Sequence, residues 1–83
     1  MPSSRVFHSE AYDLYLYHND HMLPHLHYVS SEFGAVFAID TANLIVGSVC
    51  KRKHIKEVHD WILEHQDELI DLWNSRQKRV GRN

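Results

Sequence analysis

The chain has one cysteine, two prolines and three glycines among its 83 residues. A single cysteine excludes an internal disulfide and is typical of a protein in the reducing cytoplasm. No apolar run approaches the length of a membrane span, and the first residues lack a signal-peptide pattern, so we expect a cytoplasmic protein without membrane contact. A formal net charge of −2 gives no overall attraction to nucleic acid. Gly-rich phosphate loops, nucleophile motifs and zinc-finger spacings are also missing.

Histidine is the residue that the chain has in abundance. There are eight histidines, and the stretch HNDHMLPHLH (18–27) contains four of them. Protonating all eight would turn the net charge from negative to positive, so the electrostatics of the protein should respond to mild acid. A chain of this length forms a single domain, 1–83, with a small core that benefits from a partner or a bound ion.

The first half of the chain, 5–49, predicts a small antiparallel β-meander of three to five strands. Its alternating or apolar segments are RVFH (5–8), YDLYLYH (12–18), HLHYVS (25–30), AVFAID (35–40) and LIVGSV (44–49). NDHMLP joins the second segment to the third, because Asn, Asp and Pro favour turns. In the short loop 41–43 we expect Asn43 to adopt the left-handed conformation.

The second half, 51–77, predicts helix. Apolar positions recur there at spacings of three and four, with one histidine among them. This stripe consists of Ile55, Val58, Ile62, His65, Leu69 and Leu72. It fits one long helix or two short ones, and we favour a break at Gln66–Asp67, where Asp67 can cap a second helix. The helical part should cover one face of the meander in an α+β fold, followed by a frayed basic tail, 78–83.

Three segments in this order resemble a family of bacterial and phage proteins. The segments are YLYHNDHMLPHLH, the strand pair AVFAID and LIVGSV, and WILEHQDELIDLW. They are similar to the family catalogued as domain of unknown function 4160, whose members have a strand, an H-x-P-P-H-F-H motif, a hairpin and a helical end with a Trp…His…Glu-Leu…Trp pattern. The resemblance extends from Val6 to Trp73. The chain departs from the motif at Leu23–Pro24, where the family has two prolines.

The resemblance implies a context and not a reaction. Genes of this family often lie beside a gene for another small uncharacterised domain, in the manner of toxin–antitoxin pairs. His21, His25 and His27 keep their places in the motif despite the single proline.

The histidine-rich stretch is a candidate metal site. His25 and His27 are two apart, so on a strand they point to the same face. Pro24 restricts the preceding loop, from which His21 can supply a third nitrogen, and Asp20 or His18 can complete the set or orient a ring. Nitrogen and oxygen ligands without thiolate suit a divalent transition metal such as zinc, manganese or nickel. Two alternatives stay open, a metal-free acid–base or anion site and histidines that only hold the loop together.

The remaining histidines have different expected roles. His65 occupies the apolar stripe, where a core position is favoured, but it can close the metal site if the helix packs over His25 and His27. We expect His59 to be half exposed, and His8 and His54 to lie on the surface.

Charged residues suggest two further surfaces. Lys51, Arg52 and Lys53 precede the helix, where cations oppose the helix dipole. Their placement is explained if they form an anion site for phosphate or nucleic acid. The alternative is a solvated turn. An acidic stripe runs beside the apolar one, either solvated or docked by a basic partner. Its members are Glu57, Asp60, Glu64, Asp67, Glu68 and Asp71.

Two functions therefore compete. The first is an interaction or regulatory protein of a toxin–antitoxin-like or phage-encoded module. The second is a metal-dependent hydrolase or ribonuclease that acts on a phosphate-bearing substrate. We expect a protein partner or a homodimer, because Tyr15, Tyr17, Trp61, Trp73 and a short edge strand should leave an apolar patch that needs cover.

Overall fold

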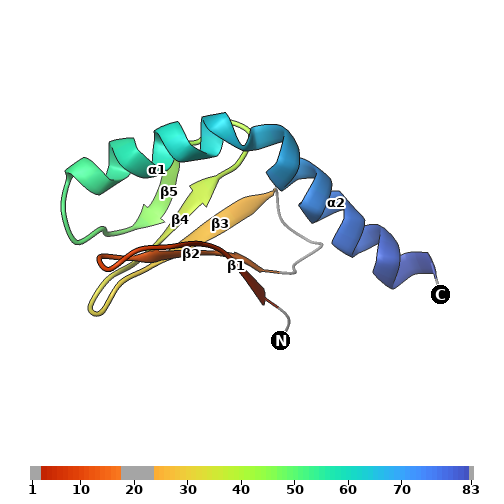
Figure 1. The fold of residues 1–83 in the computed structure, drawn as a ribbon, viewed down its shortest axis with the longest axis horizontal. Helices are drawn as coiled ribbons and strands as arrows, with labels where there is room; N and C mark the ends of the chain where they lie inside the picture. The colour runs from red at the N-terminus through yellow and green to blue at the C-terminus, as the bar shows by residue number, and fades with distance from the viewer. Residues whose placement is uncertain (1–2, 18–23, 83) are drawn as a thin grey trace.

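Five strands come first in the chain and two helices follow them (Figure 1). The structure, a computed structural model, describes residues 3–17 and 24–82. The strands are β1 (Ser3–His8), β2 (Asp13–Tyr17), β3 (His25–Val29), β4 (Gly34–Ala38) and β5 (Leu44–Gly47). The helices are α1 (Lys53–Glu64) and α2 (Gln66–Arg82). This arrangement confirms the predicted α+β fold.

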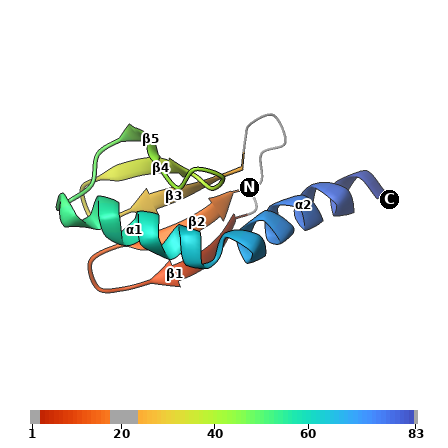
Figure 2. The ribbon, with the colours of Figure 1, turned by 90° about the horizontal axis from the view of Figure 1, so that it is seen from above.

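The sheet is a simple meander. Its strands lie in chain order, β1-β2-β3-β4-β5, and every neighbouring pair is antiparallel. β1 and β5 are consequently its two edges (Figure 2). The outer pairings each contain a register shift, between Arg5 and Phe7 in β1 and opposite Val36 and Phe37 in β5. Such bulges are common at sheet edges, where they increase the local twist.

The two faces of the sheet have different surroundings. α1 lies across one face, and the strands send alternate side chains toward it (Figures 1 and 2). On β3, Leu26 and Tyr28 are completely buried on the helix side. The intervening His27 belongs to the other face, where its cross-strand partners are Tyr15 and Val36. The alternation therefore places the histidines of β3 away from α1.

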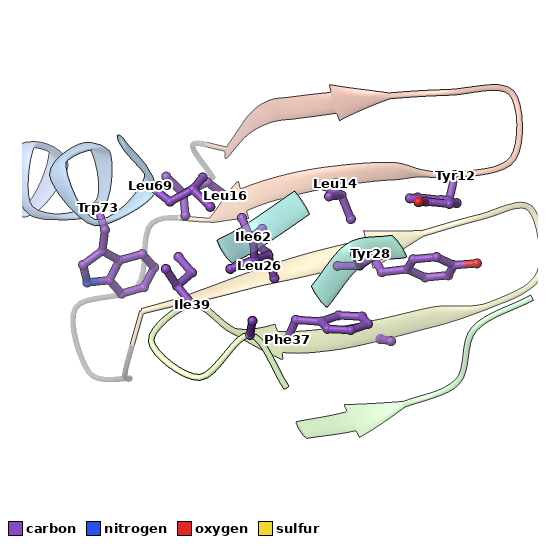
Figure 3. Packing of buried hydrophobic residues seen from close by; sticks show 13 residues of the cluster. Tyr12, Leu14, Leu16, Leu26, Tyr28, Phe37, Ile39, Ile62, Leu69 and Trp73 are labelled. Atoms are coloured by element: carbon purple, nitrogen blue, oxygen red, sulfur yellow. The ribbon is translucent and has the colours of Figure 1, made fainter. Parts of the chain in front are cut away.

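The core fills the space between the sheet and the helices (Figure 3). Its completely buried large side chains are Tyr28, Phe37, Leu14, Leu16, Leu26, Ile39, Ile62 and Val58. Trp73 of α2 extends this core to the end of the sheet where β3 begins (Figure 3). Burying such side chains stabilises the fold by about 1.5–3 kcal/mol each.

The helical half breaks at His65, one residue before the predicted Gln66–Asp67, and Asp67 lies inside the first turn of α2 and does not cap it. The His65 backbone is not helical, with φ −116° and ψ 17°, and its N–H donates to the carbonyls of Trp61 and Ile62. Its own carbonyl accepts from the N–H of Leu69 at 2.9 Å, so α2 starts directly after the break. α2 then continues to Arg82, past the expected helix end at residue 77.

The apolar stripe differs from the prediction at its C-terminal end. Val58, Ile62 and Leu69 are buried as expected, but Leu72 is 36% exposed and Trp73 is buried in its place. Leu69 and Trp73 are four residues apart and so share one side of α2, which is the side that faces the core. None of the helices in the described ranges is long and apolar enough to cross a membrane.

The loop between β4 and β5 is fastened to the helices. Ala42, and not Asn43, has the left-handed conformation, with φ 64°. Ala42 is completely buried, and its carbonyl accepts a hydrogen bond from His59 Nδ1 at 2.8 Å. The side-chain amide of Gln66 donates to the carbonyls of Ile39 and Asp40, both at 2.8 Å. These contacts fix the conformation of the loop. They, and not the intrinsic preference of Asn for left-handed geometry, therefore determine which residue has the positive φ.

Candidate functional site

A pair of histidines at the start of β3 is the part of the predicted site that the structure describes. The ring centroids of His25 and His27 lie 5.1 Å apart, with 57° between the ring planes. This proximity follows from their spacing of two residues on a strand. His18, Asp20 and His21, which the sequence analysis added to the pair, lie outside the described residues.

One member of the pair, His25, lies against α2. His25 is only 4% exposed, and its ring centroid lies 5.3 Å from that of Trp73. His27 is half-buried beside it. Burial lowers the pKa of His27, and the charge of His25 lowers it further. Both effects favour the neutral imidazole, because burial removes the water that solvates the charged form and a neighbouring positive charge repels it.

A neutral imidazole is the form that binds a metal ion, since the coordinating nitrogen has to carry a lone pair. His25 and His27 can thus supply two nitrogen ligands from one strand. Within 3–17 and 24–82, no three His, Cys, Asp or Glu side chains gather into a group that could hold a metal. A complete site therefore needs donors beyond these ranges, and the predicted donors of 18–21 are of the right kind.

His65 does not join the pair. Its ring stacks on Trp61 with centroids 4.3 Å apart, and its Nδ1 lies 2.8 Å from the Trp61 carbonyl. His65 holds the junction of α1 and α2 through these contacts. The role of closing a metal site, which the sequence analysis offered for His65, has no support in this geometry.

His54 is the largest departure among the histidines. The prediction for His54 is a surface position, but it is only 3% exposed and belongs to the buried side of the first turn of α1. Its Nδ1 lies 2.8 Å from the hydroxyl of Tyr28, and its ring centroid lies 4.6 Å from that of Tyr12. A signal was present in the sequence, because His54 precedes the buried Val58 by four residues and so shares its helix face.

The other two histidines match their expected exposure. His8 is exposed, and its Nδ1 lies 2.7 Å from a carboxylate oxygen of Asp13. This hydrogen bond, assisted by the charges of His8 and Arg5, lowers the pKa of Asp13. His59 is half-buried and anchors the loop at Ala42.

The basic turn lies where the sequence placed it. Lys51, Arg52 and Lys53 are exposed at the N-terminus of α1. Arg52 is the N-cap residue, makes no side-chain cap hydrogen bond, and no acidic residue lies in the first turn. Three cationic side chains therefore lie at the N-terminus of the helix, and anion binding there stays a prediction.

Comparison with known proteins places the chain in a family. No curated protein and no solved structure matches it. One family model matches residues 12–74, a range that includes β2, the histidine pair, the hairpin and the helical segment up to Trp73. The chain therefore belongs to the family described as Domain of unknown function (DUF4160).

Proposed function

We propose that the protein is a small interaction protein of a toxin–antitoxin-like or phage-encoded regulatory module, and that it assembles through the free edge of β5. The observation that carries the proposal is the exposure of two adjacent apolar side chains on an edge strand. Ile45 is 56% exposed and Val46 is 59% exposed. An edge strand presents unpaired N–H and C=O groups, so apolar side chains beside them favour the addition of another strand.

The opposite edge is protected against strand addition. β1 carries Arg5 and His8, which are exposed and gather around Asp13. Charged side chains on an edge strand hinder pairing with another chain. Around β5, by contrast, no charged residue occurs between Asp40 and Lys51. Both edges contain a bulge, so the difference between them is one of charge and apolar exposure.

The partner that suits this edge is a second copy of the chain. Antiparallel pairing of two β5 strands would extend the sheet across a two-fold axis and place apolar side chains opposite each other. An uncharged strand does not repel its own copy, whereas like charges opposite each other destabilise a pair. The patch expected around Trp61 and Trp73 is not the reason for this proposal, because Trp73 is 4% exposed.

Hydrogen–deuterium exchange at low and high protein concentration tests the pairing. If two copies join through β5, the backbone amides of Leu44–Gly47 exchange more slowly at high concentration, while those of β1 do not change. Equal exchange of β5 at both concentrations would contradict the proposal.

The histidine pair supports a second candidate function, a metal-dependent hydrolase or ribonuclease. The supporting observation is that the ring centroids of the buried His25 and the half-buried His27 lie 5.1 Å apart, with the pKa of His27 lowered. A metal held there would lower the pKa of a bound water and so supply a nucleophile. The test is cleavage of a labelled single-stranded RNA. Cleavage that stops when a chelator is added, and that is lost in His25→Ala, would favour this function over the first.

A further inference from the structure

A groove between the protected edge of the sheet and the first helix is a separate site, which the proposed function does not use. The cavity has a volume of about 300 Å³. Aromatic side chains form its floor and carboxylates form its rim. The residues concerned are Phe7, Tyr12, Trp61, Glu57, Asp60 and Glu64.

The aromatic floor is built from packed rings of two layers. Phe7 of β1 lies edge-on to Trp61 of α1, with ring centroids 5.6 Å apart. Phe7 also stacks on Tyr12 at 5.6 Å. Trp61 lines a second, adjoining cavity of about 360 Å³, which Val6, His65 and Leu72 also border. The half-buried Trp61 is therefore the wall that the two cavities share.

The carboxylates of the rim flank Trp61 on the same helix. Glu57 lies four residues before Trp61 and Glu64 lies three residues after it, so both are its neighbours on the helix surface. Asp60 already has a cation, because Lys56 Nζ lies 2.9 Å from its carboxylate. Within the described residues, no salt bridge engages Glu57 or Glu64. Glu57 accepts a hydrogen bond from the hydroxyl of Tyr12, at 3.0 Å.

We infer that this groove binds an arginine-bearing segment of a partner protein, with an arginine side chain lying against Trp61 and Phe7 and paired with Glu64 or Glu57. Charge complementarity sets the sign of the partner, because an acidic rim repels phosphates and attracts cations. The aromatic floor selects arginine over lysine, since a guanidinium stacks on aromatic rings and pairs with a carboxylate through two parallel hydrogen bonds.

The test is a binding titration with two labelled synthetic peptides of equal length, one of alternating arginine and alanine and one of alternating lysine and alanine. We expect the wild-type protein to bind the arginine peptide about threefold more tightly, the size of an exposed cation–π contribution. Trp61→Leu, which keeps an apolar side chain, should remove this preference. Glu64→Gln should weaken binding of both peptides about threefold, as for an exposed ion pair.

The matched control is Asp71→Asn, a carboxylate-to-amide change at an exposed position of α2 that does not line the groove. It should bind both peptides like the wild type. Absence of binding by the wild type, an arginine preference that survives Trp61→Leu, or equal weakening by Asp71→Asn and Glu64→Gln would each overturn the inference. Glu64 is exposed, so its change tests the groove even if Trp61→Leu does not fold. A Val46→Lys variant should still bind the peptide, which separates this inference from the proposal for β5.

Discussion

The hydroxyl of Tyr28 lies 2.8 Å from Nδ1 of His54, inside the core and beneath the first turn of α1. The same hydroxyl accepts a hydrogen bond from the backbone N–H of Cys50 at 2.9 Å. One phenol on β3 thus ties the chain before α1 and the first turn of α1 to the sheet, and positions the helix over the core.

Replacing Tyr28 by phenylalanine should destabilise the protein by about 1–3 kcal/mol, because it leaves a buried ring nitrogen and a backbone N–H without their partner. The matched control is Tyr12→Phe, which removes a hydrogen bond to the exposed Glu57. Water can replace that partner, so the cost should be below about 1 kcal/mol. Urea unfolding of both variants measures the difference, and equal costs would show that the buried bond has no special role.

The two glycines at the β4–β5 pairing should differ in their tolerance of alanine. Gly47 has φ 98°, and an added Cβ would lie 2.6 Å from the Cα of Ala35 and closer still to the Gly34 carbonyl. Gly47→Ala should therefore cost at least about 2 kcal/mol, from backbone strain and overlap. At Gly34 the nearest atom to an added Cβ is the Tyr28 carbonyl oxygen at 3.8 Å, so Gly34→Ala should change stability by less than about 1 kcal/mol. Thermal unfolding measures the difference, and equal melting temperatures of the two variants would contradict this account.

Stability should decrease in mild acid because of His27. Its pKa in the folded protein lies below the ordinary value of 6.5, so the unfolded chain takes up a proton there at a higher pH. The free energy of unfolding should be unaffected by His27 well above pH 6.5, fall as the pH drops through 6.5, and level off below the folded-state pKa. Urea unfolding at a series of pH values, with a chelator present, follows this change. The decrease should be smaller in His27→Gln, and an identical decrease would assign it to other groups.

A metal at the histidine pair should raise the melting temperature. Zinc, manganese or nickel added near neutral pH stabilises the folded state by mass action if it binds there. The rise should disappear in the double variant His25→Ala, His27→Ala, and should shrink below about pH 6, where protons compete for the nitrogens. Differential scanning fluorimetry of chelator-treated protein provides the measurement. A wild type that melts at the same temperature with and without each metal would remove the metal hypothesis.

The sheet and the helix break were predictable because local patterns determine them. Alternation located β2 and β3 to within a residue or two, since one face of each strand is buried. The spacing of Val58, Ile62 and Leu69 showed which side of the helices faces the core. The shared face of His25 and His27 followed from the same reasoning.

What the sequence did not predict depends on contacts between distant segments. His54 is buried because Tyr28, 26 residues earlier, offers it a hydrogen bond. Ala42 adopts a left-handed conformation because His59 and the core hold it there. The exposed apolar edge at Ile45 and Val46 became visible only when the sheet order made β5 an edge.

The molar mass in solution tests the central proposal, assembly through β5, most directly. Light scattering coupled to size-exclusion chromatography should give twice the chain mass for the wild type at high concentration, and the single-chain mass for Val46→Lys. The control Ser31→Lys adds the same charge at an exposed position in the turn between β3 and β4, and should stay dimeric. A wild type that remains a monomer at every concentration, or a Val46→Lys variant with the same mass as the wild type, would contradict the proposal.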